Sequence, residues 1–292
     1  MASSHINTAS SKFPQQIKSN QGKHKATGAT WRVINGDSVK VLETLPANHF
    51  SCVVTSPPYF WQRDYDVDGQ IGLEPTIDSY VQSICDTMDE VKRVLSSTGV
   101  LFLNLGDTYY SAKGRPQGND PKHNGRRLKI LRAVDTSGLG VPQKTLIGTP
   151  WRIALAMIER GWILRAPIVW RREKAIPEPS AVDRPWRTYE FVFMFSKNRK
   201  YEFSRQILKD AGEEDIWTIE SRPTNGNHPA VFPAELVERC LKIGNPKKGP
   251  VLDPFAGSGT VLQVANALEM DSVGIELNAN FCSEMAQRLR KP

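Results

Sequence analysis

Short apolar, β-branched runs alternate along this chain with longer stretches in which apolar residues recur every three or four positions. The short runs are typical of strands that are buried on both faces of a parallel sheet. They occupy residues 31–35, 51–55, 100–105, 163–170, 189–196, 250–252 and 272–275. The longer stretches predict amphipathic helices at residues 76–95, 149–160, 233–244 and 259–268, and a last helix ending near residue 289. This alternation predicts a doubly wound α/β fold.

Residues 107–148 and 200–227 interrupt the alternation. The first stretch is rich in Gly, Pro and basic residues, and the second is irregular. Long loops inside a compact domain are commonly functional. Residues 1–29 are rich in Ser, Lys, Gln and Asn and contain no acidic residue, which is typical of a disordered basic tail. We therefore expect one domain over residues 30–292, with two insertions that serve recognition.

A Gly-rich turn joins the predicted strand at 250–252 to the helix that follows it. The turn reads Asp253-Pro254-Phe255-Ala256-Gly257-Ser258-Gly259-Thr260. Because Gly257 and Gly259 carry no side chains, a ligand can approach the backbone and the free N–H groups at the start of the helix. Glu276 ends the next strand, 19 residues after Gly257. An acidic residue at such a position accepts hydrogen bonds from the hydroxyls of an adenosine ribose.

Two common classes of nucleotide ligand do not fit this turn. A nicotinamide fingerprint has a third Gly near the start of the helix, where this chain has Val261 and Leu262. A Walker phosphate loop needs a Lys directly after its last Gly, and none follows Gly259. The turn therefore predicts an adenosine ligand without a pyrophosphate.

The tetrapeptide Ser56-Pro57-Pro58-Tyr59 directly follows the predicted strand at 51–55. Ligands of open α/β sheets bind at the carboxyl ends of the strands. Two prolines restrict φ and remove two N–H donors, so the Ser56 hydroxyl and the Pro57 carbonyl are held as acceptors. Two acceptors that bind both hydrogens of an exocyclic amine localise its lone pair on nitrogen and direct it at an electrophilic methyl group. Tyr59 is placed to stack on a base that has rotated out of the duplex.

Together, these motifs resemble the β group of S-adenosylmethionine-dependent DNA amino-methyltransferases, in which the catalytic motif precedes the cofactor motif. The resemblance extends from Trp31 to Arg290. It includes residues 35–37, 69–75, 103–107, 168–170, 183–185 and 215–217. It implies a Rossmann-like class I methyltransferase sheet with circularly permuted motif order. It also implies S-adenosylmethionine as the cofactor.

The resemblance assigns roles to individual residues. Asp37 would contact the adenine amino group of the cofactor, and His228, Pro229 and Phe232 would help to bind its methionine part. The remaining cofactor residues would be Asp253, Phe255, Gly257, Ser258, Gly259, Thr260 and Glu276. In this family, Ser before Pro-Pro-Tyr usually accompanies cytosine, and Asp or Asn accompanies adenine. We therefore expect a site-specific methyltransferase acting on N4 of cytosine in duplex DNA, with N6 of adenine as the alternative.

Two features of the chain depart from the family pattern. Residues 171–173 read Arg-Arg-Glu, where relatives more often have Lys-Pro after the Trp. No large separate domain for target recognition is visible either. If sequence specificity is encoded in this chain, it must reside in residues 107–148 and 200–227.

The net charge of +7 is concentrated in one segment. Residues 113–132 contain seven basic residues against Asp120 alone. Such a cluster suits a polyanion binder, although charge alone fits a solvated loop equally well. The resemblance favours double-stranded DNA as the partner. The predicted DNA contacts are Lys113, Arg115, Lys122, Arg126, Arg127, Lys129 and Arg132 in this segment, with Arg171, Arg172, Arg184 and Arg187 elsewhere.

Other classes of function are less consistent with the sequence. An inactive DNA-binding module with this fold would be expected to lose Ser56, Gly257 or Glu276, and all three are present. Methylation at C5 of cytosine needs a Cys nucleophile, and none of the four cysteines follows a proline. An RNA-modifying enzyme remains an alternative.

The cysteines and the apolar runs bear on compartment and partners. The four cysteines are scattered, which favours neither a metal site nor disulfides and suits a reducing compartment. No apolar run approaches the roughly 20 residues of a membrane span. We expect a cytoplasmic, nucleoid-associated enzyme. Its natural protein partner would be a restriction endonuclease acting on the same site, which the sequence does not identify.

Overall fold

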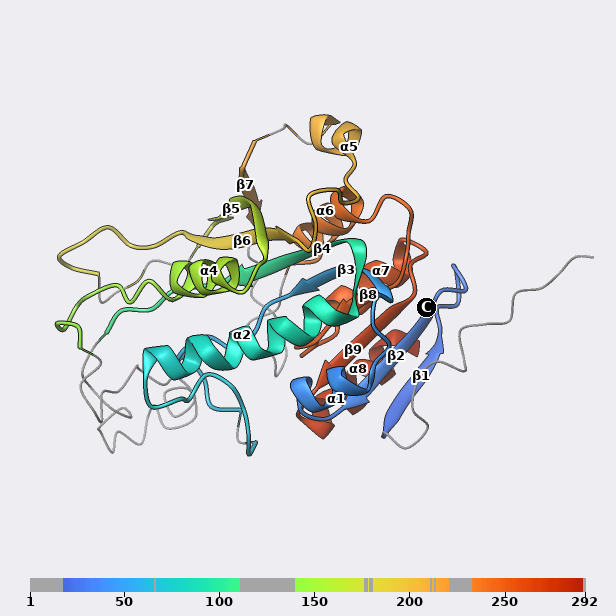
Figure 1. Ribbon diagram of the computed structural model, residues 1–292, viewed down its shortest axis with the longest axis horizontal. Helices are drawn as coiled ribbons and strands as arrows, with labels where there is room; N and C mark the ends of the chain where they lie inside the picture. The colour runs from blue at the N-terminus through green and yellow to red at the C-terminus, as the bar shows by residue number, and fades with distance from the viewer. Residues whose placement is uncertain are drawn as a thin grey trace, which may run out of the picture.

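A nine-stranded sheet forms the centre of the described part of the protein (Figure 1). The computed structural model describes residues 18–65, 67–110, 140–175, 178, 181–210, 212, 214–220 and 233–290. The strands are β1 (Ser19–Lys23), β2 (Thr30–Asn35), β3 (Phe50–Thr55), β4 (Leu95–Leu105), β5 (Ile163–Glu173), β6 (Tyr189–Ser196), β7 (Ile216–Glu220), β8 (Val251–Asp253) and β9 (Ser272–Glu276). Their order in space is β1-β2-β9-β8-β3-β4-β6-β5-β7.

The strand order confirms the predicted permuted Rossmann-like sheet. Strands β2, β9, β8, β3 and β4 are mutually parallel. Strand β6 runs antiparallel to both β4 and β5. Although β8 lies near the end of the sequence, it pairs with β3, with Val251 opposite Cys52 and Leu252 opposite Val53. The strand that precedes the Gly-rich turn therefore adjoins the strand that precedes Ser56.

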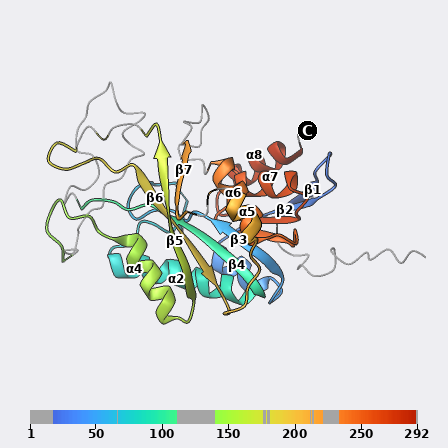
Figure 2. The ribbon, with the colours of Figure 1, turned by 90° about the horizontal axis from the view of Figure 1, so that it is seen from above.

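Helices cover both faces of the sheet (Figure 2). They are α1 (Ser38–Thr44), α2 (Ile77–Val94), α4 (Thr149–Glu159), α5 (Arg205–Asp210), α6 (Ala234–Gly244), α7 (Thr260–Ala267) and α8 (Ala279–Arg290). Apolar residues of α1, α2 and α4 pack on one face, and those of α6, α7 and α8 pack on the other. Alternate residues of β3 serve the two cores: Val53 belongs to the first and Val54 to the second, as expected because successive strand side chains point to opposite faces.

The structure corrects the expected boundaries of the irregular segments. Residues 1–29 are not a tail throughout, because β1 lies within them and pairs with β2 as an antiparallel edge strand. The stretch 200–227 contains α5 and β7, and β7 pairs in parallel with β5. The sequence does not predict strand β7, because it is only five residues long and its buried residues, Trp217 and Ile219, alternate with more exposed ones.

Asp107 fastens the two ends of the first insertion together. Its carboxylate accepts hydrogen bonds from the backbone N–H groups of Gly148 (3.0 Å) and Thr149 (3.2 Å). The N-cap of helix α4 is Gly148, which has no capping side chain. Asp107 supplies the missing acceptor from the end of β4, and this side-chain acceptor satisfies donors that a helix start leaves unpaired. The two ends of the insertion, after β4 and before α4, therefore lie side by side.

Candidate active site

The ends of five parallel strands place the predicted cofactor and catalytic residues along one edge of the sheet. The strands β2, β3, β4, β8 and β9 end at Asn35, Thr55, Leu105, Asp253 and Glu276. Because β6 is antiparallel to β4, its first residues lie at the same edge. This arrangement brings the Ser56 segment and the Gly-rich turn side by side, since β3 and β8 are neighbours.

The Gly-rich turn has the backbone conformation that glycine permits. Gly257 and Gly259 have φ values of +50° and +81°, in the left-handed region that other residues rarely adopt. A Cβ atom on Gly259 would lie 2.4 Å from Met285 Cγ on α8, whereas one on Gly257 would meet nothing closer than the Phe255 carbonyl at 3.9 Å. Gly259 is therefore needed for packing, and the space beside Gly257 is open.

Glu276 holds the Gly-rich turn through its carboxylate. One oxygen accepts a hydrogen bond from the Gly257 N–H (2.9 Å), and the other accepts one from the Asn278 N–H (2.8 Å). Burial raises the pKa of Glu276, and these backbone hydrogen bonds oppose that rise. Each carboxylate oxygen keeps a further lone pair, so Glu276 can still accept hydrogen bonds from a ligand.

Asp37 lies next to this turn, at the start of α1. It is the N-cap of the helix, and its Oδ1 accepts a hydrogen bond from the Lys40 N–H (3.0 Å). The adjacent Ser38 hydroxyl donates to the Pro254 carbonyl (2.6 Å), and Asn35 Nδ2 donates to the Glu276 carbonyl (3.0 Å). These contacts draw Asp37, the Gly-rich turn and Glu276 into one group.

This group of residues fits an adenosine-containing cofactor. The open space beside Gly257, the acceptor lone pairs of Glu276 and the N-terminus of α7 face the same turn. Phe255 is half-buried, and the Ser258 and Thr260 hydroxyls lie 3.2 Å apart on the turn. Three further predicted cofactor residues, His228, Pro229 and Phe232, lie outside the described residues.

Asp253 connects the Gly-rich turn to the catalytic strand. Its Oδ1 accepts hydrogen bonds from the Thr55 hydroxyl (2.7 Å) and from the Phe255 N–H (3.0 Å). Thr55 and Asp253 are both buried. Burial raises the pKa of Asp253 to about 7, against the effect of these two hydrogen bonds. The residue next to Ser56 is thus bonded directly to the turn.

The Ser56-Pro57-Pro58-Tyr59 segment is held by contacts with helix α2 and with the end of β4. The Tyr80 hydroxyl on α2 donates to the Pro58 carbonyl (2.9 Å). A Cβ on Gly106 would lie 2.4 Å from the Tyr59 ring, so the absence of a side chain there lets the ring pack against the end of β4. Among the described residues, no donor contacts the Pro57 carbonyl. The lone pairs of that carbonyl are unengaged by those residues, although Pro57 itself is buried.

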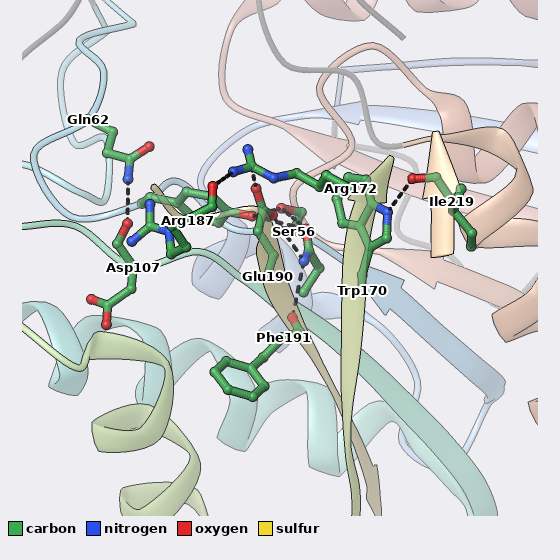
Figure 3. Close-up of polar contacts among 11 residues, drawn as sticks. Ser56, Gln62, Asp107, Trp170, Arg172, Arg187, Glu190, Phe191 and Ile219 are labelled. Carbon is green, nitrogen blue, oxygen red and sulfur yellow. Dashed lines mark hydrogen bonds and ion pairs between the residues drawn. The ribbon is translucent and has the colours of Figure 1, made fainter. Parts of the chain in front are cut away.

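A polar network lies beneath Ser56 that the sequence did not reveal (Figure 3). The Ser56 hydroxyl donates to Asn104 Oδ1 (3.2 Å) or to the Tyr59 hydroxyl (3.3 Å). The Tyr59 hydroxyl donates to Glu190 Oε2 (2.7 Å), and Asn104 Nδ2 lies 3.3 Å from the same oxygen. Glu190 comes from the start of β6. Its position could not be anticipated, because the contact depends on the antiparallel register of β4 and β6.

The four arginines predicted outside the basic cluster have different surroundings. Arg171 is exposed. Arg172 points inward, with Nη1 3.5 Å from Glu190 Oε1 and Nη2 donating to the Arg187 carbonyl (2.9 Å). Arg184 stacks on the Tyr109 ring at 3.7 Å and pairs with Glu178 (2.8 Å). The Nε and Nη1 atoms of Arg187 are buried and have no hydrogen-bond partner within the described residues. The cluster at 113–132 lies outside those residues.

Comparison with known proteins identifies the family. The sequence profile of a DNA methylase family for N6 and N4 enzymes matches residues 50–288, which include both the Ser56 segment and the Gly-rich turn. The chain belongs to this family. S-adenosylmethionine is accordingly the cofactor, and DNA is the substrate, of this methyltransferase.

The relatives of the methyltransferase include type II methyltransferases. It is 38% identical to the type II methyltransferase M.SmaI of Serratia marcescens over 88% of this chain and 90% of that protein. It is 40% identical to M.Cfr9I of Citrobacter freundii over 90% of this chain and 88% of that protein. The PvuII DNA methyltransferase (cytosine-N4-specific) shares the fold with a TM-score of 0.70 at 22% identity, over 93% of this chain and 91% of that one.

Two further structural facts bear on the methyltransferase. Within the described residues, no helix combines the length and apolar character that a membrane span requires. All four cysteines are buried free thiols.

The raised pKa of Asp253 predicts a pH dependence of stability. The unfolded carboxyl titrates near its ordinary value of 3.8 and the folded one at about 7. Between these values the folded state binds more protons, so the free energy of unfolding falls as pH rises. We expect a fall on the order of 1–4 kcal/mol from Asp253 over this window, and Asp253→Asn should lack this contribution.

Urea unfolding of both proteins from about pH 4 to about pH 7 measures the difference. Subtracting the two curves removes the titration of all other carboxylates. Identical pH slopes in the wild type and Asp253→Asn would show that the carboxyl is not buried in the way described.

Proposed function

We propose that this methyltransferase transfers a methyl group from S-adenosylmethionine to N4 of cytosine at a specific site in duplex DNA. The observation that carries the proposal is the position of Ser56 at the end of β3, one residue after the threonine that is bonded to the Gly-rich turn. The motif begins with Ser, which in this family usually accompanies cytosine. The PvuII enzyme, which shares the fold, is cytosine-N4-specific.

The Ser56 hydroxyl and the Pro57 carbonyl act as the two acceptors for the hydrogens of the target amine. Binding both hydrogens localises the lone pair on nitrogen and aims it for an in-line displacement. The cofactor supplies the electrophilic methyl group. Pro58 stiffens the segment, and its carbonyl is held by Tyr80. Tyr59, fixed through its hydroxyl and packed against Gly106 on one side, stacks on the base with the other face.

The cofactor contacts follow from the grouping around the Gly-rich turn. Glu276 accepts the ribose hydroxyls with the lone pairs that Gly257 and Asn278 leave free, and Asp37 accepts from the adenine amino group. The turn contributes through Phe255, Gly257, Ser258, Gly259 and Thr260. Asp253 contributes by holding the turn in place, because its carboxylate is engaged with Thr55 and Phe255. His228, Pro229 and Phe232 are proposed for the methionine part.

DNA lies across the carboxyl edge of the sheet in this proposal. The basic residues of 113–132, with Arg171, contact phosphates, as expected for binding that depends on charge. Arg187 would have to turn outward to join them, because its Nε and Nη1 atoms are buried. Arg172 and Arg184 support that surface from within, since both are already paired with carboxylates. The stretches 107–148 and 200–227 read the DNA sequence. A restriction endonuclease that cuts the same site is the proposed partner, and the nucleoid is the proposed location.

The base assignment predicts the modified nucleoside. Wild-type protein incubated with duplex DNA and S-adenosylmethionine should yield N4-methylcytosine after digestion to nucleosides, identified by mass and retention time. Ser56→Ala removes one acceptor and should slow transfer on the order of 10²–10³-fold, with little change in cofactor or DNA affinity. N6-methyladenine as the sole product would show that the target base is adenine. 5-Methylcytosine as the product would contradict methylation of an exocyclic amine.

The cofactor assignment predicts a loss of affinity in Glu276→Ala. Each charge-assisted hydrogen bond to the ribose contributes about 1.5–3 kcal/mol, so calorimetric titration should show S-adenosylmethionine binding at least about tenfold weaker. Gly257→Val should bind still more weakly, because its side chain fills the open space beside the turn. Glu284→Ala, on helix α8 and outside the site, serves as the control. Unchanged affinity in both site variants would refute the assignment.

A further inference from the structure

The polar network beneath Ser56 contains fewer protons than oxygen acceptors, and this determines which way each hydroxyl points. The Tyr59 hydroxyl has one proton and two acceptors within reach, Glu190 Oε2 at 2.7 Å and Asn104 Oδ1 at 3.0 Å. Hydrogen bonds to a carboxylate are shorter and stronger than neutral ones, so the proton goes to Glu190. Burial and the nearby Glu190 carboxylate hold the pKa of Tyr59 well above its usual range, so the phenol stays protonated.

Asn104 has one possible orientation in this network. Its Nδ2 donates to the Phe191 carbonyl (3.1 Å) and faces Glu190 Oε2 (3.3 Å). The reversed amide would direct its oxygen at two acceptors, which cannot donate to it. Asn104 Oδ1 therefore faces Ser56.

Ser56 then has acceptors on its inner side. Asn104 Oδ1 lies 3.2 Å away, and the Tyr59 oxygen, whose proton is committed to Glu190, lies 3.3 Å away. The single Ser56 proton is bound inward, and the hydroxyl can present only lone pairs to a substrate. That is the state required of an acceptor for an amine hydrogen.

We infer that Glu190 is a positioning residue for methyl transfer: by taking the Tyr59 proton, it keeps the Ser56 hydroxyl turned inward and makes it an acceptor toward the target amine. Arg172 fixes the carboxylate, because its Nη1 lies 3.5 Å from Glu190 Oε1 while Oε2 faces Tyr59. This role rests on the proposed function of Ser56. It assigns Arg172 to the active site from within, in place of the predicted direct contact with DNA.

Glu190→Gln tests the inference because it removes the charge that attracts the Tyr59 proton. With its oxygen toward Tyr59 and Asn104 Nδ2 the Gln side chain offers only a neutral acceptor, and with its NH2 group toward Tyr59 it offers none. In either orientation the Tyr59 proton can turn to Asn104 Oδ1 (3.0 Å) or to the Ser56 hydroxyl (3.3 Å), where it competes for the lone pairs that the amine needs. Single-turnover methyl transfer at saturating cofactor and DNA should slow on the order of tenfold to a hundredfold, less than or comparable to loss of an active-site hydrogen bond. The affinity for S-adenosylmethionine should be unchanged.

Tyr59→Phe in the Glu190→Gln background gives the decisive measurement. It removes the misdirected proton, so the double variant should transfer faster than Glu190→Gln and at about the rate of Tyr59→Phe alone. A purely structural role of Glu190 would make the double variant slower than either single variant, and that result would overturn the inference. Glu190→Asp, which keeps the charge, should recover part of the rate lost in Glu190→Gln; a rate no better than that of Glu190→Gln would also overturn it.

A matched control is available at the opposite edge of the sheet, where β4 begins. Glu202 is comparably buried, with 19% of its side chain exposed against 14% for Glu190, and it pairs with Lys247 (2.8 Å) near the start of β4. Glu202→Gln should transfer at the wild-type rate. Failure of this inference is distinguishable from failure of the proposed function. Transfer by Ser56→Ala at the wild-type rate would contradict the proposed function of Ser56. If Ser56→Ala is slow but Tyr59→Phe does not restore the rate of Glu190→Gln, only the role of Glu190 is contradicted.

Discussion

The hydrogen bond from Thr55 to Asp253 is the contact on which the arrangement of the site depends. It joins the last residues of two adjacent parallel strands, β3 and β8, that lie about 200 residues apart in the chain. Ser56 follows Thr55 directly, and Asp253 also holds the Phe255 N–H at the start of the Gly-rich turn. One buried carboxylate thus fixes the position of the methyl acceptor motif relative to the cofactor motif. A methyl transfer that relies on positioning requires such a constraint.

The antiparallel strand β6 supplies the second half of the site. Because β6 runs against β4, its first residues meet the carboxyl ends of the parallel strands, and Glu190 is brought beneath Tyr59 and Asn104. The next strand, β5, ends at the same edge and contributes Arg172 as a counter-charge. A half-buried carboxylate near the target amine would be costly without such a partner. Strand direction therefore explains why the network forms where it does.

Much of the fold could be predicted because it is encoded locally. Buried strands are apolar and β-branched, helices carry periodic apolar residues, and Gly257 and Gly259 mark a turn that other residues would not form. Strand β1 could not be predicted, because Ser19–Lys23 is polar and its pairing depends on β2. Gly22 packs against the Trp31 ring of β2, and a Cβ on Gly22 would lie 2.5 Å from that ring. This contact exists only when the two strands are paired.

The candidate site divides in the same way. Ser56, Glu276 and the turn were found because their spacing carries the signal. Asn104 lies within residues 103–107, which resemble the family, but the sequence does not show its hydrogen-bond partners. No local sequence pattern marks Glu190 as a site residue. Arg172 was expected to reach outward to DNA, since a sequence shows charge but not the direction of a side chain. The sequence alone does not predict side-chain contacts between strands that are far apart in the chain.

The link between Thr55 and Asp253 is tested most directly by Thr55→Val, which keeps the side-chain shape and removes the hydroxyl. S-adenosylmethionine affinity and the single-turnover rate would be measured beside Thr87→Val, a control whose buried hydroxyl bonds to the Ser83 carbonyl within α2 (3.1 Å). The loss of a hydrogen bond to a carboxylate, about 1.5–3 kcal/mol, should lower affinity, rate or both by at least about tenfold in Thr55→Val, with no change in Thr87→Val. Wild-type affinity and rate in Thr55→Val would contradict the account.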